Sequence, residues 1–237
     1  MANDDHSISK GSSATQIDTF LRKVASTPLV KAARQQGRLI FALDATASRQ
    51  PTWDQASGLQ AQMFSEAAAL GGLQLQLCYY RGYNEFSATA WIADGDKLLD
   101  RMSGVFCRAG TTQIARVLQH AVTQARQQPV QGVIFVGDCM EEDADRLYRL
   151  AGELRLLNAP LFVFHEGHDA IAEKTFQHIA ELSGGACCPF DTNSPGQLRD
   201  LLRAVAVYAA GGRKALQQFG HAAGTDVLRL MHQLDRK

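Results

Sequence analysis

Short apolar runs recur along the middle of the chain, and each is long enough to form a β-strand. The clearest covers residues 39–44, and similar runs cover residues 130–136, 160–164 and 186–190. Their apolar residues are consecutive rather than alternating, which is typical of strands buried on both faces of a parallel sheet. We therefore expect these runs to form the centre of such a sheet.

A second pattern predicts an antiparallel edge. Residues 73–80 begin with leucine at every other position, and residues 85–91 form another extended run after an Arg-Gly-Tyr-Asn turn. Alternation is typical of a strand with one solvated face, and the short turn favours a hairpin. We expect these two runs to pair at one edge of the sheet.

Between the strands, hydrophobic residues recur with the period of an α-helix. Helices are expected over residues 51–70, 94–102, 113–127, 141–156, 170–183 and 194–210. The alternation predicts the α/β class: a doubly wound, mostly parallel sheet with one antiparallel edge strand and helices on both faces.

The chain is expected to have three parts. Residues 1–36 predict a disordered, polar start followed by a short amphipathic helix and a linker. Residues 37–211 carry the strand and helix pattern of a single α/β domain. Residues 212–237 follow a Gly-Gly break and predict a helical extension.

Composition narrows the classes of function. The 237 residues include 46% hydrophobic and 20% charged residues, as expected for a globular core. Lys and Arg total 24, as do Asp and Glu, so no excess charge predicts binding to nucleic acid or an anionic membrane. No apolar run reaches the ~20 residues that span a bilayer, and the acidic first residues do not resemble a secretory signal. Five cysteines without Cys-x-x-Cys spacing favour reduced thiols and a cytoplasmic location.

Oxygen-bearing side chains follow two of the predicted strands. Asp44 ends the first strand, and the hydroxyls of Thr46 and Ser48 follow at alternate positions. Asp138 ends the strand over residues 130–136 in the same way. Ligands of doubly wound folds bind at the carboxyl ends of the strands, where the strand order reverses. An all-oxygen set at this edge suits a hard cation such as Mg²⁺.

A third segment completes a resemblance to a known family. The loop over residues 109–114 (Ala-Gly-Thr-Thr-Gln-Ile) opens a helix, and together with Asp44-Ala45-Thr46-Ala47-Ser48 and Asp138 it resembles the von Willebrand factor type A (VWA) domain with its metal-ion-dependent adhesion site (MIDAS). That family carries Asp-x-Ser-x-Ser after its first strand, and here Thr46 replaces the first serine. The resemblance runs from about residue 38 to 211 and is to bacterial, stand-alone members.

The resemblance implies a metal site and a binding function. Its ligand set is Asp44, Thr46, Ser48, Thr112 and Asp138, with Thr111 as the fallback for Thr112. Mg²⁺ is the expected ion, and Mn²⁺ or Ca²⁺ would suit the same oxygens. In such a site the cation bridges to an Asp or Glu of a partner protein and breaks no bond, so no enzyme activity, nucleic acid or membrane insertion is expected.

Two other functions remain open at this stage. The run ending in Asp44 is also similar to haloacid-dehalogenase-type phosphatases, in which the strand ends in a nucleophilic aspartate. Those enzymes carry a second Asp as acid/base where this chain has Thr46. A metal-independent interaction scaffold is the third hypothesis.

Several other polar groups have ordinary structural explanations. His165-Glu166-Gly167-His168 lacks the His-Glu-x-x-His spacing of a zinc helix, so a polar loop is expected. The acidic cluster over residues 141–145 suits the first turn of a helix. Cys139 follows Asp138 and could be exposed, with no activating partner visible in sequence. The other cysteines are expected to be buried thiols: Cys78, Cys107, Cys187 and Cys188.

Overall fold

The structure of the chain is a computed structural model. It describes residues 37–50, 73–190, 204–205 and 207–209, together with Thr19 and Arg22. The predicted helix over residues 51–70 and most of the one over residues 194–210 lie outside these parts. The same holds for nearly all of the two end segments, so their helices, the disorder and the three-part division of the chain stay predictions.

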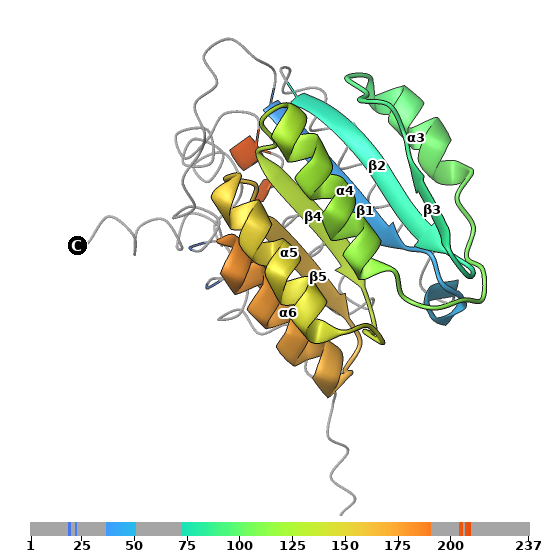
Figure 1. Cartoon of the computed structure of the whole chain (residues 1–237). Coiled ribbons are helices and arrows are strands. Elements are labelled where there is room, and N and C mark those ends of the chain that lie inside the picture. Colours follow the sequence, from blue (N-terminus) through green and yellow to red (C-terminus); the bar gives the residue numbers. More distant parts are fainter. Residues whose placement is uncertain are drawn as a thin grey trace, which may run out of the picture.

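The described residues form a six-stranded sheet in the order β3-β2-β1-β4-β5-β6 (Figure 1). All neighbouring strands are parallel except β2 and β3, which form the predicted antiparallel edge. The predicted fold class is confirmed. The strands are β1 (Gly37–Asp44), β2 (Leu73–Arg81), β3 (Glu85–Ala88), β4 (Gly132–Gly137), β5 (Leu161–Glu166) and β6 (Ala186–Phe190).

Helices connect these strands close to where the sequence predicts them. A short 3₁₀ helix, η1 (Ala47–Arg49), follows β1, and the α-helices are α3 (Gly95–Ser103), α4 (Ile114–Gln127), α5 (Ala144–Leu156) and α6 (Ala170–Ser183). α4, α5 and α6 lie side by side on one face of the sheet (Figure 1). Aspartate side chains cap three of the helices, which fixes where they begin: Asp94, Asp143 and Asp169.

The burial pattern of β1 explains its consecutive apolar residues. Leu39, Phe41 and Leu43 pack into one hydrophobic cluster with residues 204–205 and 207–209. Ile40 and Ala42 belong to a second hydrophobic cluster, on the other face of the sheet. This cluster also contains buried residues of α4, α5 and α6. Both faces of the strand are therefore covered, as the absence of alternation predicts.

The order in which strands are added to the sheet reverses at β1. From β1 the chain adds β2 and β3 on one side and then β4, β5 and β6 on the other (Figure 1). The carboxyl ends of β1 and β4 are therefore neighbours at the reversal of strand order, where ligands of such folds bind. Asp44 is the last residue of β1, and Asp138 directly follows β4.

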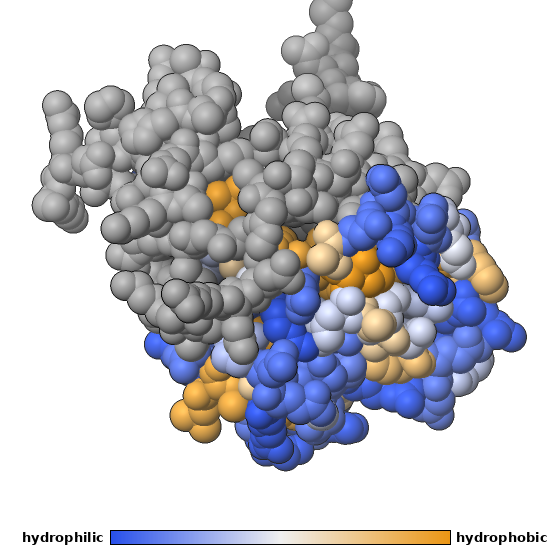
Figure 2. Space-filling model, turned by 90° about the horizontal axis from the view of Figure 1, so that it is seen from above, coloured by the Kyte–Doolittle hydropathy of each residue, from blue (hydrophilic) through white to orange (hydrophobic). Residues whose placement is uncertain are grey.

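The described surface is mostly hydrophilic in the view from above, with hydrophobic residues in small, separate areas (Figure 2). Four large hydrophobic residues of the described parts are exposed: Tyr83, Phe106, Leu156 and Ile171. No helix in the described ranges combines the length and apolar character needed to cross a membrane.

Candidate metal site

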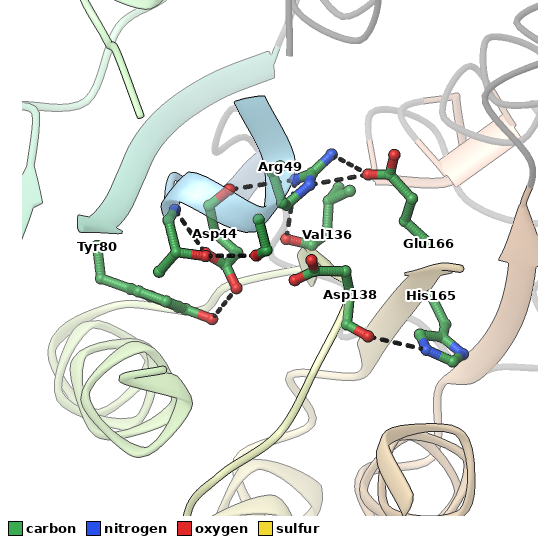
Figure 3. A network of polar contacts seen from close by, with 9 residues as sticks. Asp44, Arg49, Tyr80, Val136, Asp138, His165 and Glu166 are labelled. Carbon is green, nitrogen blue, oxygen red and sulfur yellow. Dashed lines mark hydrogen bonds and ion pairs between the residues drawn. The ribbon is translucent and has the colours of Figure 1, made fainter. Parts of the chain in front are cut away.

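Asp44 is held in a fixed orientation at the end of β1. Its side chain is fully buried. Oδ1 accepts a hydrogen bond from the Thr46 backbone N–H (2.8 Å), and Oδ2 accepts one from the Tyr80 hydroxyl (2.8 Å). Figure 3 shows the Tyr80 contact reaching across from β2. Two donors from different elements leave this carboxylate one orientation.

The surroundings of Asp44 disfavour an uncompensated negative charge. Burial raises its pKa most, and the neighbouring Asp138 raises it further, while hydrogen bonds from Thr46 and Tyr80 lower it. Oxygens of the two carboxylates lie within 4.8 Å of each other. Two unit charges at that separation repel by roughly 3 kcal/mol at an effective dielectric constant of about 20. A cation between them would remove this cost.

Thr46 and Ser48 bring their hydroxyls together beside Asp44. Thr46 Oγ1 and Ser48 Oγ are 3.1 Å apart. Adjacent oxygens of an octahedral Mg²⁺ shell lie about 2.9 Å apart, because each bond is about 2.05 Å long. The spacing of this hydroxyl pair therefore fits two neighbouring positions in such a shell. Thr46 is buried and Ser48 is exposed at the rim.

Asp138 is the second carboxylate of the site and has fewer partners. It is half-buried, and within the described parts of the chain its Oδ1 is buried and accepts no hydrogen bond. Its backbone carbonyl lies 3.3 Å from His165 Nε2. Figure 3 shows the Asp44 and Asp138 carboxylates turned toward the same space. A buried carboxylate oxygen without a donor is a natural ligand for a cation.

Thr112, just before α4, is hydrogen-bonded to Glu141 in the loop after β4. Its side chain is buried, its Oγ1 accepts a hydrogen bond from the Glu141 N–H (3.2 Å), and its own N–H donates to Glu141 Oε2 (3.3 Å). Thr111 is exposed. The hydroxyl of Thr112 keeps a second lone pair for a ligand. Of the two threonines, Thr112 is therefore the buried one, and its role as a ligand stays a prediction.

A buried ion pair lies next to the site and was not predicted from the sequence. Arg49, at the end of η1, is buried and binds Glu166 through Nε (2.8 Å) and Nη2 (2.7 Å). Its Nη1 also donates to the carbonyls of Asp44 (3.2 Å) and Val136 (3.4 Å) (Figure 3). Arg49 therefore ties together the ends of β1, β4 and β5. The residues of the pair are 117 positions apart, so local pattern gives no signal of it.

The prediction that His165-Glu166-Gly167-His168 forms a polar loop is wrong for its first half. His165 and Glu166 are buried and belong to β5, while Gly167 and His168 are exposed. Burial lowers the pKa of His165, whose ring packs edge-on against Phe176. The strand continues into polar residues because each has a partner: the Asp138 carbonyl for His165 and Arg49 for Glu166.

The acidic cluster serves two helices. Asp143 caps α5 and Asp145 lies in its first turn, as the sequence predicts. Glu142 instead accepts hydrogen bonds from the N–H groups of Ile114 and Ala115, at the start of α4. Because Asp143 is the N-cap, α5 begins at Ala144 rather than at residue 141.

The cysteines are partly as expected. Cys78 and Cys188 are buried, whereas Cys107, Cys139 and Cys187 are only half-buried. Burial, together with the carboxylates of Asp138 and Asp44, raises the pKa of the Cys139 thiol to about 12. A raised pKa keeps the thiol protonated, which agrees with the sequence-based expectation that Cys139 has no activating partner.

Two arginines and two exposed aromatic residues lie on β2, on the turn that follows it and on the loop after α3. We call Arg81, Tyr83, Phe106 and Arg108 the arginine–aromatic rim. The Arg81 guanidinium lies 4.1 Å from the centre of the Phe106 ring. The backbone N–H of Arg108 donates a hydrogen bond to the backbone carbonyl of Ala45, the residue directly after Asp44 (3.0 Å).

The two loops that carry the rim pack closely. A Cβ at Gly110 would lie 2.0 Å from the Gly82 carbonyl oxygen, so only glycine allows this approach. The loop over residues 105–110 is thus held against the β2–β3 turn, and its Arg108 pairs with Thr46 in an isolated bridge.

Comparisons with known proteins rest on structure alone. No protein-family profile matches the sequence, and no curated protein matches it. The VWA domain of SpRpn10 superposes with a TM-score of 0.56 at 16% identity, covering 70% of this chain and 94% of that one. Proximal thread matrix protein 1 from the mussel byssus, with a zinc-occupied MIDAS motif, gives a TM-score of 0.58 at 13% identity. That match covers 73% of this chain and 46% of the other.

A third solved structure gives a similar match. The ArnB paralogue VWA2 from Sulfolobus acidocaldarius gives a TM-score of 0.52 at 15% identity, covering 73% of this chain and 46% of that one. The chain thus spans less than half of two of these three structures. At such low identity the likeness concerns the fold. The described part of this chain has the fold of a VWA-type domain.

Proposed function

We propose that this protein is a metal-dependent protein-binding module whose metal site lies at the carboxyl ends of β1 and β4. One observation carries the proposal. An oxygen of the fully buried Asp44 carboxylate lies within 4.8 Å of an oxygen of Asp138, and among the described residues the buried Oδ1 of Asp138 has no hydrogen-bond partner. Such a pair is costly without a cation and favourable with one.

The donor set around these carboxylates suits Mg²⁺. Thr46, Ser48 and Thr112 would contribute hydroxyl oxygens, and Asp44 and Asp138 would bind directly or through water. When bound, Mg²⁺ supplies a hard Lewis acid with an open position for a carboxylate of another protein. The zinc-occupied MIDAS motif of the mussel protein supports metal binding in this fold. Asp44, held by two donors, would keep the site oriented.

The arginine–aromatic rim supports an acidic partner. The side chain of Arg108 is 60% exposed and that of Arg81 is 18% exposed. Glu85 pairs with both arginines and offsets part of their positive charge. The arginines would therefore add to the attraction that the metal exerts on a carboxylate-bearing segment. The exposed rings of Tyr83 and Phe106 offer apolar contact area beside these charges. A partner segment that places Asp or Glu on the metal would lie across this rim.

Catalysis by Asp44 is the weaker hypothesis. Both of its oxygens accept hydrogen bonds, which reduces their nucleophilicity. Burial raises the pKa of Tyr80 and of the Cys139 thiol, so neither suits a general base near neutral pH. Thr46 stands where the phosphatases carry their acid/base. We therefore propose binding without bond cleavage.

The test compares recovery of partners by immobilised protein with Mg²⁺ and with EDTA. We expect wild type to retain a partner only with Mg²⁺, and Asp44→Asn to retain none under either condition. Equal recovery in EDTA would instead support a metal-independent scaffold. Mg²⁺-dependent hydrolysis of a phosphoester, lost in Asp44→Asn, would support the phosphatase hypothesis.

A further inference from the structure

Cys139 lies beside the two carboxylates of the candidate site. Its Sγ, one oxygen of Asp44 and one oxygen of Asp138 all lie within 4.8 Å of one another. No other group of three such ligands occurs in the described ranges. The cysteine is half-buried and follows β4, whose register with β1 is fixed by the sheet. Its position is therefore built by the same elements that place the carboxylates.

The second carboxylate of this group has an oxygen without a partner. Asp138 Oδ1 is buried and accepts no hydrogen bond from the described residues. The unpartnered oxygen is a second observation, independent of the cysteine, that points to a ligand in this space.

A sulfur donor changes which metals the site can hold. Thiolates are soft ligands that select zinc and similar ions, whereas Mg²⁺ takes oxygen ligands. Zinc is bound tetrahedrally by three protein groups and one exchangeable position in sites that remain open, with ligand atoms roughly 3.5 Å apart. Asp44, Asp138 and Cys139 would supply three such groups once their ligand atoms, which lie within 4.8 Å of one another, close around the ion.

Resting on the function proposed above, we infer that Cys139 is a metal ligand and that the site binds a thiophilic divalent cation such as Zn²⁺ more tightly than Mg²⁺. The Cys139 thiolate forms the metal–sulfur bond, and the thiol proton is released to solvent. The remaining position takes the partner's carboxylate. Thr46 and Ser48 become less important for this ion than for Mg²⁺, because hydroxyls are hard ligands.

Cobalt(II) gives a direct readout, because a cobalt–thiolate bond produces a near-ultraviolet charge-transfer absorption that oxygen ligands do not. The reduced full chain is titrated with Co²⁺, then with Zn²⁺ in competition. Cys139→Ser removes the thiolate and puts a hydroxyl of similar size in its place. Cys187→Ser is the matched control, since Cys187 is also half-buried and burial raises its pKa to about 12 as well.

We expect the absorption in wild type and in Cys187→Ser, and its loss in Cys139→Ser and in Asp44→Asn. Zn²⁺ affinity should fall on the order of tenfold or more in Cys139→Ser while Mg²⁺ affinity stays within about threefold. Co²⁺ binding without the absorption, displaced by Mg²⁺, would overturn the role of Cys139 and leave the proposed function standing. Failure of wild type to bind Co²⁺, Zn²⁺ or Mg²⁺ would overturn both.

Discussion

The two halves of the candidate site are built differently. The β1 half consists of Asp44, Thr46, Ser48 and the buried Arg49 beneath them. In it, both oxygens of the carboxylate accept hydrogen bonds, and Arg49 anchors the backbone to β4 and β5. The β4 half consists of Asp138 and Cys139. Here one carboxylate oxygen is buried without a donor from the described residues, and the thiol is half-buried.

The β1 half of the site is therefore the more rigid one, and the β4 half has more free capacity to bind a cation. The β1 half is fixed before any ligand arrives, so it can hold donors in position at little entropic cost on binding. The β4 half retains unsatisfied capacity, so it gains most when a cation arrives. Each substitution below is expected to affect one half more than the other.

The largest effect on stability is expected from Arg49→Met, in the β1 half. Removing the guanidinium leaves Glu166 buried without its partner, which costs about 3–5 kcal/mol. The free energy of unfolding in urea measures this. Arg126→Met is the control, because its pair with Glu153 is exposed and contributes about 1 kcal/mol or less. Equal losses in the two variants would contradict an anchoring role for Arg49.

Asp44→Asn and Asp138→Asn compare the two carboxylates directly. Each is expected to lower Mg²⁺ affinity by about 10–100-fold, measured by calorimetry. In metal-free protein near neutral pH, Asp44→Asn should also raise the melting temperature, by about 2–4 °C for each kcal/mol of relieved cost. Asp138→Asn should change it less, because that side chain is partly exposed.

The pH dependence follows from the raised pKa of Asp44. Between its ordinary value of 3.8 and its higher folded value, the folded protein binds more protons than the unfolded chain. The contribution of Asp44 to the stability of metal-free wild type is therefore lost as pH rises through this window. Asp44→Asn should remove that loss, and thermal melts at a series of pH values show it. A loss of the same size in both proteins would place its origin elsewhere.

Thr112→Val tests the loop that joins the two halves. Loss of the hydroxyl removes the hydrogen bond from Glu141 N–H, at a cost of about 1 kcal/mol, and should weaken Mg²⁺ binding about tenfold. Thr111→Val is the matched control and should stay within about 0.5 kcal/mol of wild type, because Thr111 is exposed. The reverse ranking for Mg²⁺ would restore Thr111 as the ligand.

The smallest effect is expected from Glu142→Gln. The amide oxygen replaces only one of the two carboxylate oxygens that accept from the N–H groups of Ile114 and Ala115, and the favourable charge at the helix N-terminus is lost. Thermal unfolding should report a decrease of about 1 kcal/mol, with Mg²⁺ affinity almost unchanged. A large drop in Mg²⁺ affinity would assign Glu142 to the site itself.

The sheet was predictable because its central strands begin as consecutive apolar runs, its edge begins with alternating leucines, and the turns between its elements are polar. The positions of Asp44 and Asp138 follow from the rule that parallel strands end at one edge. Interactions between distant residues were not predictable. Glu166 looked like part of a loop because its local sequence is polar, yet Arg49 stabilises it as the end of a strand. Likewise, Glu142 caps α4 rather than the helix that follows it in the chain.

The most direct test is calorimetric titration of Mg²⁺ into metal-free wild type and Asp44→Asn under identical conditions. We predict saturable heat from a single site in wild type and none in Asp44→Asn, with both proteins folded by circular dichroism. Absence of heat in wild type at millimolar Mg²⁺, or equal binding by the two proteins, would contradict a metal site at the ends of β1 and β4.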